Sequence, residues 1–268
     1  MNGAKSGAAA RRAPSETAGE ANRLVPVRTR TSLRTTTVTA SDKDPVAMKL
    51  YRFAYSPYAR KVQMLLDLMG AAYETVDVAY GQRQELARLT GGYIYVPVLV
   101  DDDGTVLVES RNICEKLLVG PAAAMLLPPP WEGPIWAYND FVDGPLEDVL
   151  FRIASPAIRD AWVDPFERAL YLLIKERKFG AGCVEAWEEN RPSLIDKAQR
   201  LLEPTLTTLA QQPFLFGATP TLADAALYGN CMMLEVGDKH LLARVSPALV
   251  DYSRRLEDFA ASRHRPAL

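Results

Sequence analysis

The sequence predicts two folded domains, an α/β domain followed by an all-α helical domain. Residues 48–118 alternate between strand-like and helix-like patterns, whereas residues 131–268 show only helical patterns. Between them, residues 119–130 contain four prolines and predict a linker, because proline continues neither a helix nor a strand. Of the 268 residues, 48% are hydrophobic and 24% are charged, a balance typical of soluble globular proteins.

The first domain is predicted to run in the order βαβ, α, ββ, α. Its predicted strands are residues 48–53, 73–78, 96–100 and 105–108, and its predicted helices begin near Ser56, Gln82 and Glu109. Ser56 is a good N-cap, and Pro57 suits the first helical position because its missing N–H has no partner within the helix. Parallel pairing of the first two strands through this helix gives a right-handed βαβ unit. This order is that of the thioredoxin fold.

The second domain is predicted to consist of helices alone. Its predicted helices cover residues 131–153, 164–179, 192–211, 221–236 and 246–261. The fourth opens on a box with Gly217, Thr221 and Asp224 as its fixed points. Thr221 as N-cap and Asp224 three residues later satisfy each other's backbone donors, so this box is expected to serve folding rather than catalysis.

Residues 1–47 differ from the rest of the chain. They contain no aromatic residue and show no regular hydrophobic period, so they cannot bury enough apolar surface to offset their ordering entropy. Residues 22–40 carry four arginines and no acid, as organelle transit peptides do, although Glu16 and Glu20 lie upstream. Three interpretations stay open: a disordered extension, a start misassigned upstream of Met48, and a transit peptide.

Charge and residue usage exclude several classes of function. A formal charge of −2 gives no reason to expect nucleic acid or an anionic membrane as a partner, and no apolar run reaches the length of a membrane span. Three scattered cysteines without Cys-x-x-Cys spacing indicate a reducing compartment and no thiol–disulfide catalysis. Two histidines leave no basis for a histidine triad or a multi-histidine metal site.

Four motifs together resemble the glutathione transferase superfamily from Met48 onward. They are Ser56-Pro-Tyr-Ala-Arg-Lys-Val62, Val96-Pro-Val-Leu, Glu109-Ser110 and the box that ends at Asp224. The resemblance implies a thioredoxin-like domain joined to an all-α helical bundle. It further implies glutathione as cosubstrate, no metal, a small hydrophobic electrophile as second substrate, and a homodimer with a role in detoxification. We expect the protein to be cytoplasmic, or organellar if residues 1–47 are a transit peptide.

The resemblance also assigns a glutathione site. Pro97 stands where the fold places a cis proline, and the family uses the backbone at the position of Val96 to pair with the cysteinyl part of glutathione. At a helix N-terminus, the Ser110 hydroxyl and free N–H groups receive the γ-glutamyl carboxylate, while Glu109 accepts from the ammonium group. A plain helix cap is the alternative interpretation.

Ser56 is the predicted catalytic residue. A free thiol has a pKa near ~8.5, so a hydroxyl that donates to sulfur, together with a helix N-terminus, favours the nucleophilic thiolate. Tyr55 is the second candidate, because the family also uses tyrosine in this role. Ser56 as a simple helix cap is the structural alternative.

One stretch departs from the family pattern. Residues 91–95, Gly-Gly-Tyr-Ile-Tyr, carry no cation where the family commonly holds the glycyl carboxylate of glutathione. A tyrosine hydroxyl or one of Arg52, Arg60 and Lys61 takes over this role, or glutathione binds weakly. A non-catalytic ligand-binding or protein-interaction module of the same fold is therefore the alternative function. A glutaredoxin-like reductase is disfavoured, since no cysteine lies near Ser56.

Overall fold

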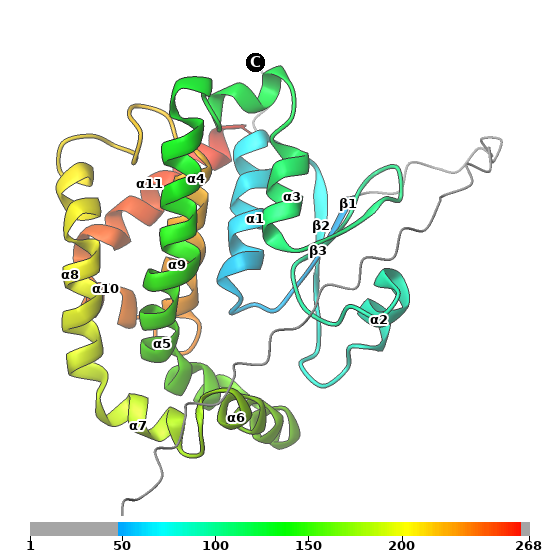
Figure 1. The fold of residues 1–268 in the computed structure, drawn as a ribbon, viewed down its shortest axis with the longest axis vertical. Coiled ribbons are helices and arrows are strands. Elements are labelled where there is room, and N and C mark those ends of the chain that lie inside the picture. The colour runs from blue at the N-terminus through cyan, green and yellow to red at the C-terminus, as the bar shows by residue number, and fades with distance from the viewer. Residues whose placement is uncertain (1–47, 264–268) are drawn as a thin grey trace, which may run out of the picture. The chain divides into compact units, whose positions relative to one another are not determined.

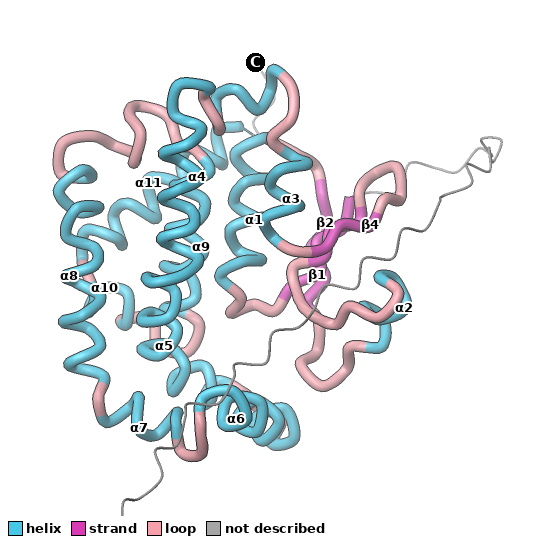
Figure 2. The backbone as a smooth tube through the Cα atoms, in the orientation of Figure 1, coloured by secondary structure: helices cyan, strands magenta, loops and turns pink. Residues whose placement is uncertain are grey.

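The computed structural model describes residues 48–263, which belong to one compact unit. The predictions made for residues 1–47 lie outside the described residues. Figure 1 shows a small sheet with its own helices beside a larger group of helices, and Figure 2 shows that the strands are confined to one side. Among the described helices, none is both long and apolar enough to cross a membrane.

The first part of the described chain has the thioredoxin-like order of elements. They are β1 (Met48–Arg52), α1 (Pro57–Met69), β2 (Tyr73–Asp77), α2 (Gln84–Thr90), β3 (Val98–Val100), β4 (Val106–Val108) and α3 (Ser110–Leu117). The sheet order is β2-β1-β3-β4, with β1 and β2 parallel and the other pairs antiparallel. Leu50 of β1 lies opposite Leu99 of β3, and both are fully buried. The predicted fold class is confirmed.

The rest of the described chain is helical. The elements are η1 (Pro121–Met125), η2 (Pro129–Trp131), α4 (Glu132–Phe141), η3 (Val142–Leu146), α5 (Glu147–Ala161), α6 (Pro165–Phe179), α7 (Cys183–Glu189), α8 (Arg191–Leu209), α9 (Leu222–Glu235), α10 (Leu241–Val245) and α11 (Pro247–Arg263). The 3₁₀ helix η1 lies within the predicted linker and η2 spans its end, with proline at the first helical positions, where it is tolerated.

One helix predicted at residues 131–153 is instead three consecutive segments. A π-helical turn, η3, separates α4 from α5, and Pro145 lies inside it. Because proline has no N–H to donate, it interrupts the α-helical ladder and favours such a turn. The short helices α7 and α10 were not predicted, because five to seven residues carry little periodic signal.

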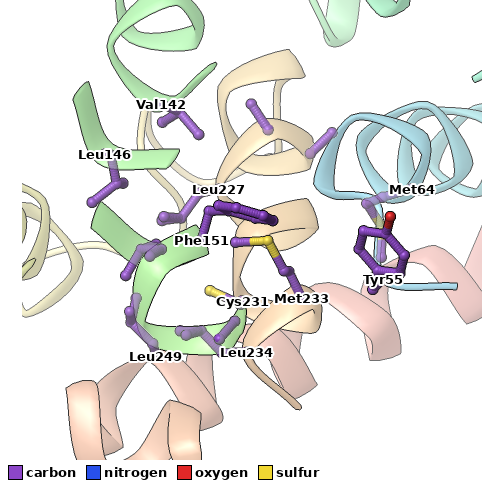
Figure 3. Packing of buried hydrophobic residues seen from close by; sticks show 14 of the residues in the cluster. Tyr55, Met64, Val142, Leu146, Phe151, Leu227, Cys231, Met233, Leu234 and Leu249 are labelled. Atoms are coloured by element: carbon purple, nitrogen blue, oxygen red, sulfur yellow. The ribbon is translucent and has the colours of Figure 1, made fainter. Parts of the chain in front are cut away.

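Helix α9 joins the two parts of the fold. Its residues pack against α1 on one side and α4 and α5 on the other. Figure 3 shows part of this core, where Leu227 and Met233 of α9 lie among side chains that include Met64 of α1 and Phe151 of α5. The apolar core is therefore continuous from the sheet domain into the helices.

Candidate active site

A cavity of about 750 Å³ lies between the sheet domain and helices α5 and α6. All six residues predicted for the site line it, namely Tyr55, Ser56, Val96, Pro97, Glu109 and Ser110. They come from three separate places in the chain, the start of α1, the approach to β3 and the start of α3. The fold thus brings together the three motifs that the sequence analysis singled out in the first domain.

Ser56 is the N-cap of α1 and is 5% exposed. Its Oγ accepts a hydrogen bond from the Ala59 N–H at 3.3 Å, as the sequence predicts for an N-cap. Within residues 48–263 the proton of this hydroxyl has no acceptor. The hydroxyl can therefore cap the helix and still donate to a group in the cavity.

A buried ion pair holds α1 in place behind Ser56. Lys61 of α1 is 1% exposed, and its Nζ lies 2.5 Å from Asp143 Oδ2 and 3.1 Å from Asn139 Oδ1. Asp143 belongs to the π-helical turn η3. Its backbone carbonyl accepts a hydrogen bond from the Tyr58 hydroxyl at 3.1 Å. The turn that breaks the predicted helix thus adds polar contacts between α1 and the helical domain, beside the packing of α1 on α9.

Tyr55 is buried, like Ser56, and lies within a cluster of aromatic rings. Its ring stacks on Phe53 with centroids 5.8 Å apart and meets the ring of Tyr171 edge-on at 5.9 Å. Burial, together with the neighbouring Tyr80 and Tyr171, raises the pKa of the Tyr55 hydroxyl well above its usual value. This hydroxyl stays protonated and is a weak acid.

The Val96–Pro97 peptide bond is cis, as the sequence analysis expects for this position. Val96 is half-buried, and strand β3 begins only at Val98. The backbone of Val96 therefore lies at the cavity wall but outside the paired part of the strand. Its polar groups can pair with an extended ligand.

Glu109 has an unusual backbone. Its φ is 69°, the one positive value of a non-glycine residue among those that the structure describes. Such a conformation costs on the order of 1–3 kcal/mol and tends to occur where the surrounding structure requires it, often at a functional site. Glu109 is exposed at the start of α3, and Ser110, the first helical residue, is 8% exposed.

Tyr93 is the neighbour that contacts Glu109 across the cavity wall. Burial raises the pKa of Tyr93, and its hydrogen bond to the Glu109 side chain raises it further. Tyr93 and Tyr95 both line the cavity, and their rings meet at 5.5 Å. These are the tyrosines of the stretch that departs from the family pattern.

The three cations considered as replacements lie elsewhere. Arg52 pairs with Asp77, Arg60 donates to the carbonyl of Ala54, and Lys61 is engaged by Asp143. None of these three lines the cavity.

Arg83 is the cation that the sequence analysis missed. It lines the cavity directly before α2, and its guanidinium carbon lies 4.5 Å from the ring centre of Tyr80 and 4.8 Å from that of Phe53. Its Nε donates to the Tyr80 carbonyl at 2.8 Å. These contacts fix the side chain at the cavity wall. In the sequence, the one sign of this role was that Arg83 stands at the start of the short helix before Val96.

The helical domain supplies the other wall of the cavity. The side chains that line it from α5 and α6 are Glu147, Asp148, Phe151, Ile174, Lys175, Lys178 and Phe179. Burial raises the pKa of the Glu147 carboxyl to about 7. Burial, followed by repulsion from Lys178, lowers the pKa of Lys175 to about 8. This wall therefore combines apolar surface with partly desolvated charged groups.

The three cysteines have no place in the site. Cys114, Cys183 and Cys231 are all buried free thiols, and burial raises the pKa of each. None of them lines the cavity. By its fold and its cavity the chain is a thioredoxin-like protein with a helical domain appended to the sheet domain.

A family model and two relatives point to the same family. Residues 50–120 match the family model of the glutathione S-transferase N-terminal domain. The chain is 29% identical to glutathione S-transferase PM239X14 of Arabidopsis thaliana, over 67% of this chain and 78% of that protein. It is 27% identical to the probable glutathione S-transferase BZ2 of Zea mays, over 56% of this chain and 71% of that one.

The fold is also similar to a solved structure. Glutathione S-transferase CsGST83044 of Ceriporiopsis subvermispora, determined in complex with glutathione, matches with a TM-score of 0.66 and 19% identity. The match covers 82% of this chain and 100% of that one. Residues 50–120 thus match the N-terminal domain of glutathione S-transferases, and the two relatives and the solved structure support the glutathione transferase superfamily for this chain.

Proposed function

We propose that this protein is a glutathione transferase that activates the thiol of glutathione for attack on a small hydrophobic electrophile. The observation that carries the proposal is the meeting of Ser56, the cis Val96–Pro97 bond and the Glu109–Ser110 pair in one cavity. None of these features alone identifies a glutathione site. Their convergence on a space that holds a tripeptide and a small second substrate is what supports the proposed activity.

Glutathione would bind along the wall formed by the sheet domain. The backbone of Val96 pairs with the cysteinyl residue, and the start of α3 at Ser110 receives the γ-glutamyl carboxylate. The exposed carboxylate of Glu109 accepts from the ligand's ammonium group. Arg83, the cation that lines this part of the cavity, binds the glycyl carboxylate in place of the residue that the family pattern leads one to expect.

Ser56 would stabilise the thiolate. Its Oγ already accepts from the Ala59 N–H, and its own proton is free to be donated to the glutathione sulfur. A hydrogen bond to sulfur at a helix N-terminus lowers the thiol pKa, and each unit corresponds to about 1.4 kcal/mol of preference for the anion. The thiol proton passes to solvent, and the sulfur forms a bond to the electrophilic carbon as its leaving group departs.

Tyr55 is the second candidate for this role. Its hydroxyl is protonated and lines the cavity, but it lies among aromatic rings that restrict its reach. Measuring glutathione conjugation to 1-chloro-2,4-dinitrobenzene separates the two residues. Ser56→Ala should lower kcat/KM by about 10²-fold or more, and Tyr55→Phe by less than about 10-fold. The reverse order would assign the role to Tyr55.

Calorimetry with glutathione tests the proposal at its base. We expect binding in the micromolar to millimolar range and turnover with the chlorodinitrobenzene. Binding without turnover over a broad panel of electrophiles would favour the non-catalytic module, and no binding at millimolar glutathione would refute a glutathione site.

We also propose that the protein forms a homodimer and acts in the cytoplasm in detoxification. We propose that it divides into a glutathione-binding domain at residues 48–118, a linker at residues 119–130 and a helical domain at residues 131–268. The resemblance to the superfamily supports the assembly. Sedimentation velocity checks the dimer, limited proteolysis checks the division, and fractionation of cells checks the location.

A further inference from the structure

The wall of the cavity formed by the helical domain carries two lysines where a hydrophobic electrophile would be expected to meet only apolar groups. Lys175 and Lys178 lie three residues apart on α6, and both line the cavity. On a helix, residues with this spacing are neighbours, and like charges there repel each other. Such an arrangement costs stability unless something compensates for it.

The protein compensates for this repulsion only in part, through aromatic rings and through attraction to the Glu147 carboxyl. Within residues 48–263, neither Lys175 nor Lys178 has a carboxylate within ion-pair distance. The Lys175 Nζ lies instead over aromatic faces, 4.6 Å from the ring centre of Phe151 and 4.8 Å from that of Tyr171. Lys178 lies 4.9 Å from the ring centre of Phe179. Aromatic faces attract a cation but leave its N–H donors free to bind an anion.

The acidic groups of the same cavity are occupied or only partly ionised. Asp148 is held by Arg152 at 2.7 Å, and Glu109 lies beside Tyr93 on the wall of the sheet domain. Glu147 interacts electrostatically with both lysines, yet it makes no ion pair with either among the described residues. Its pKa of about 7 means that it is partly protonated near neutral pH and can itself donate a hydrogen bond.

We infer that the second substrate of this cavity is an electrophile with an anionic group, a carboxylate on an aromatic frame, which Lys175 and Lys178 bind. The aromatic frame packs against Phe151 and Phe179. The carboxylate lies between the two ammonium groups and relieves their mutual repulsion. This inference rests on the proposed function, since it names the class of electrophile that the glutathione thiolate attacks.

Binding of an unreactive pair of ligands tests the inference without any turnover. The full chain, loaded with glutathione, is titrated by calorimetry with 3,5-dinitrobenzoate and with the neutral 3,5-dinitrobenzamide. Neither has a leaving group. We expect the benzoate to bind at least 10-fold more tightly to the unaltered protein, and Lys175→Met with Lys178→Met to remove this preference. Equal affinity of the two ligands for the unaltered protein would overturn the inference.

Arg177→Gln is the matched control. Arg177 lies on the same helix, is exposed, and does not line the cavity, so its replacement removes one positive charge from α6 but none from the proposed site. The preference for benzoate should survive in this variant. Thermal unfolding of all variants checks that they fold. A loss of the preference in Arg177→Gln as large as in the double variant would show a general field effect and overturn the inference.

Two further measurements distinguish a failure of this inference from a failure of the proposed function. The double variant should bind glutathione as tightly as the unaltered protein; a matching loss of glutathione affinity would assign the lysines to glutathione and overturn the inference. Conjugation of 4-chloro-3,5-dinitrobenzoate and its amide forms the C–S bond and releases chloride. The ratio of their kcat/KM values, each divided by the uncatalysed rate, should fall about 10-fold in the double variant. Absence of turnover with both, and with the broad panel of electrophiles, would count against the proposed function, while the calorimetry still decides the inference.

Discussion

Gly229 of α9 lies directly against the first turn of α1, so that a Cβ built on it would be 2.2 Å from the carbonyl oxygen of Pro57. It would also lie 2.9 Å from the backbone nitrogen of Lys61. Both contacts are with backbone, which cannot move aside as a flexible side chain can. The N-terminus of α1, and with it Ser56, is therefore positioned by the absence of a side chain at residue 229.

Gly229→Ala should displace the start of α1. We expect a loss of about 1–3 kcal/mol in the free energy of unfolding from overpacking, in spite of the gain of about 0.5–1 kcal/mol that alanine brings to a helix. Because Ser56 moves with the helix, kcat/KM for conjugation should fall as well. Urea unfolding and steady-state kinetics measure the two effects.

Gly133→Ala is the matched control for this substitution. Gly133 lies in the first turn of α4, and a Cβ there meets no atom within 4 Å. We expect unchanged or slightly raised stability and unchanged kinetics. If Gly229→Ala behaved in the same way, the close approach of α9 would not position α1.

Asp224→Ala should destabilise the protein strongly. The carboxylate is fully buried and accepts from the Thr221 N–H at 2.8 Å, the Leu215 N–H at 2.9 Å and the Tyr252 hydroxyl at 2.9 Å. Its loss leaves several buried donors without a partner, so we expect a cost of about 2–4 kcal/mol, measured by urea unfolding.

Asp164→Ala gives the comparison for an exposed cap. Asp164 is the N-cap of α6 and accepts from the Phe166 N–H at 2.9 Å, but water can replace it. A cost near or below about 1 kcal/mol is expected. Equal costs for the two substitutions would contradict the importance of burial at Asp224.

Helix caps also show what can be predicted from sequence. Ser56 accepts from Ala59 and Asp224 accepts from Thr221, each three positions away, so these two bonds can be predicted from a short stretch of sequence. The same holds for Pro97 and for the Glu109–Ser110 pair, whose motifs are local. The bonds of Asp224 to Leu215 and Tyr252 span nine and 28 positions and cannot be predicted from such a stretch.

The other wall of the cavity could not be found in this way. Lys175 and Glu147 reach the cavity only because α5 and α6 pack beside the sheet domain, and no periodic pattern reports which face of a helix borders a cavity. Likewise, Asp143 pairs with Lys61 across 82 positions of sequence through a π-helical turn that the helical period does not reveal. Arg83 is held by rings from two different segments, Phe53 and Tyr80.

Glu147 should make stability depend on pH. Its pKa is about 7 in the folded protein against 4.5 for an ordinary glutamate, because burial disfavours the carboxylate. Between these two pH values the folded state holds more protons than the unfolded chain, so the free energy of unfolding falls as the pH rises. Glu147→Gln should remove this component, worth about 1–3 kcal/mol between pH 5 and pH 7.5.

Urea unfolding at pH 5 and at pH 7.5 measures the effect. Lys175 does not interfere, because its lowered pKa of about 8 changes stability mainly at higher pH, where the unfolded chain holds the extra proton. Glu189→Gln, an exposed substitution on α7, should leave the difference between the two pH values unchanged. If the free energy of unfolding changed by the same amount between the two pH values in the unaltered protein and in Glu147→Gln, the Glu147 carboxyl would be well solvated.

Arg83 should recognise one end of glutathione only. If its guanidinium binds the glycyl carboxylate, Arg83→Met removes a charge-assisted hydrogen bond worth about 1.5–3 kcal/mol, and the Kd for glutathione should rise roughly 10- to 100-fold. The glycyl monoethyl ester of glutathione lacks this charge. Its Kd should be nearly the same for the variant and the unaltered protein.

Calorimetry with glutathione and with its ester measures the interaction between Arg83 and the glycyl carboxylate directly. Arg88→Met serves as control, because Arg88 belongs to the same helix region but does not line the cavity, so both affinities should stay unchanged. A loss of affinity in Arg83→Met that is equal for glutathione and its ester would show that Arg83 acts through the packing of Phe53 and Tyr80. In that case Tyr93 and Tyr95, which line the same wall, would be the groups left to hold the glycyl end.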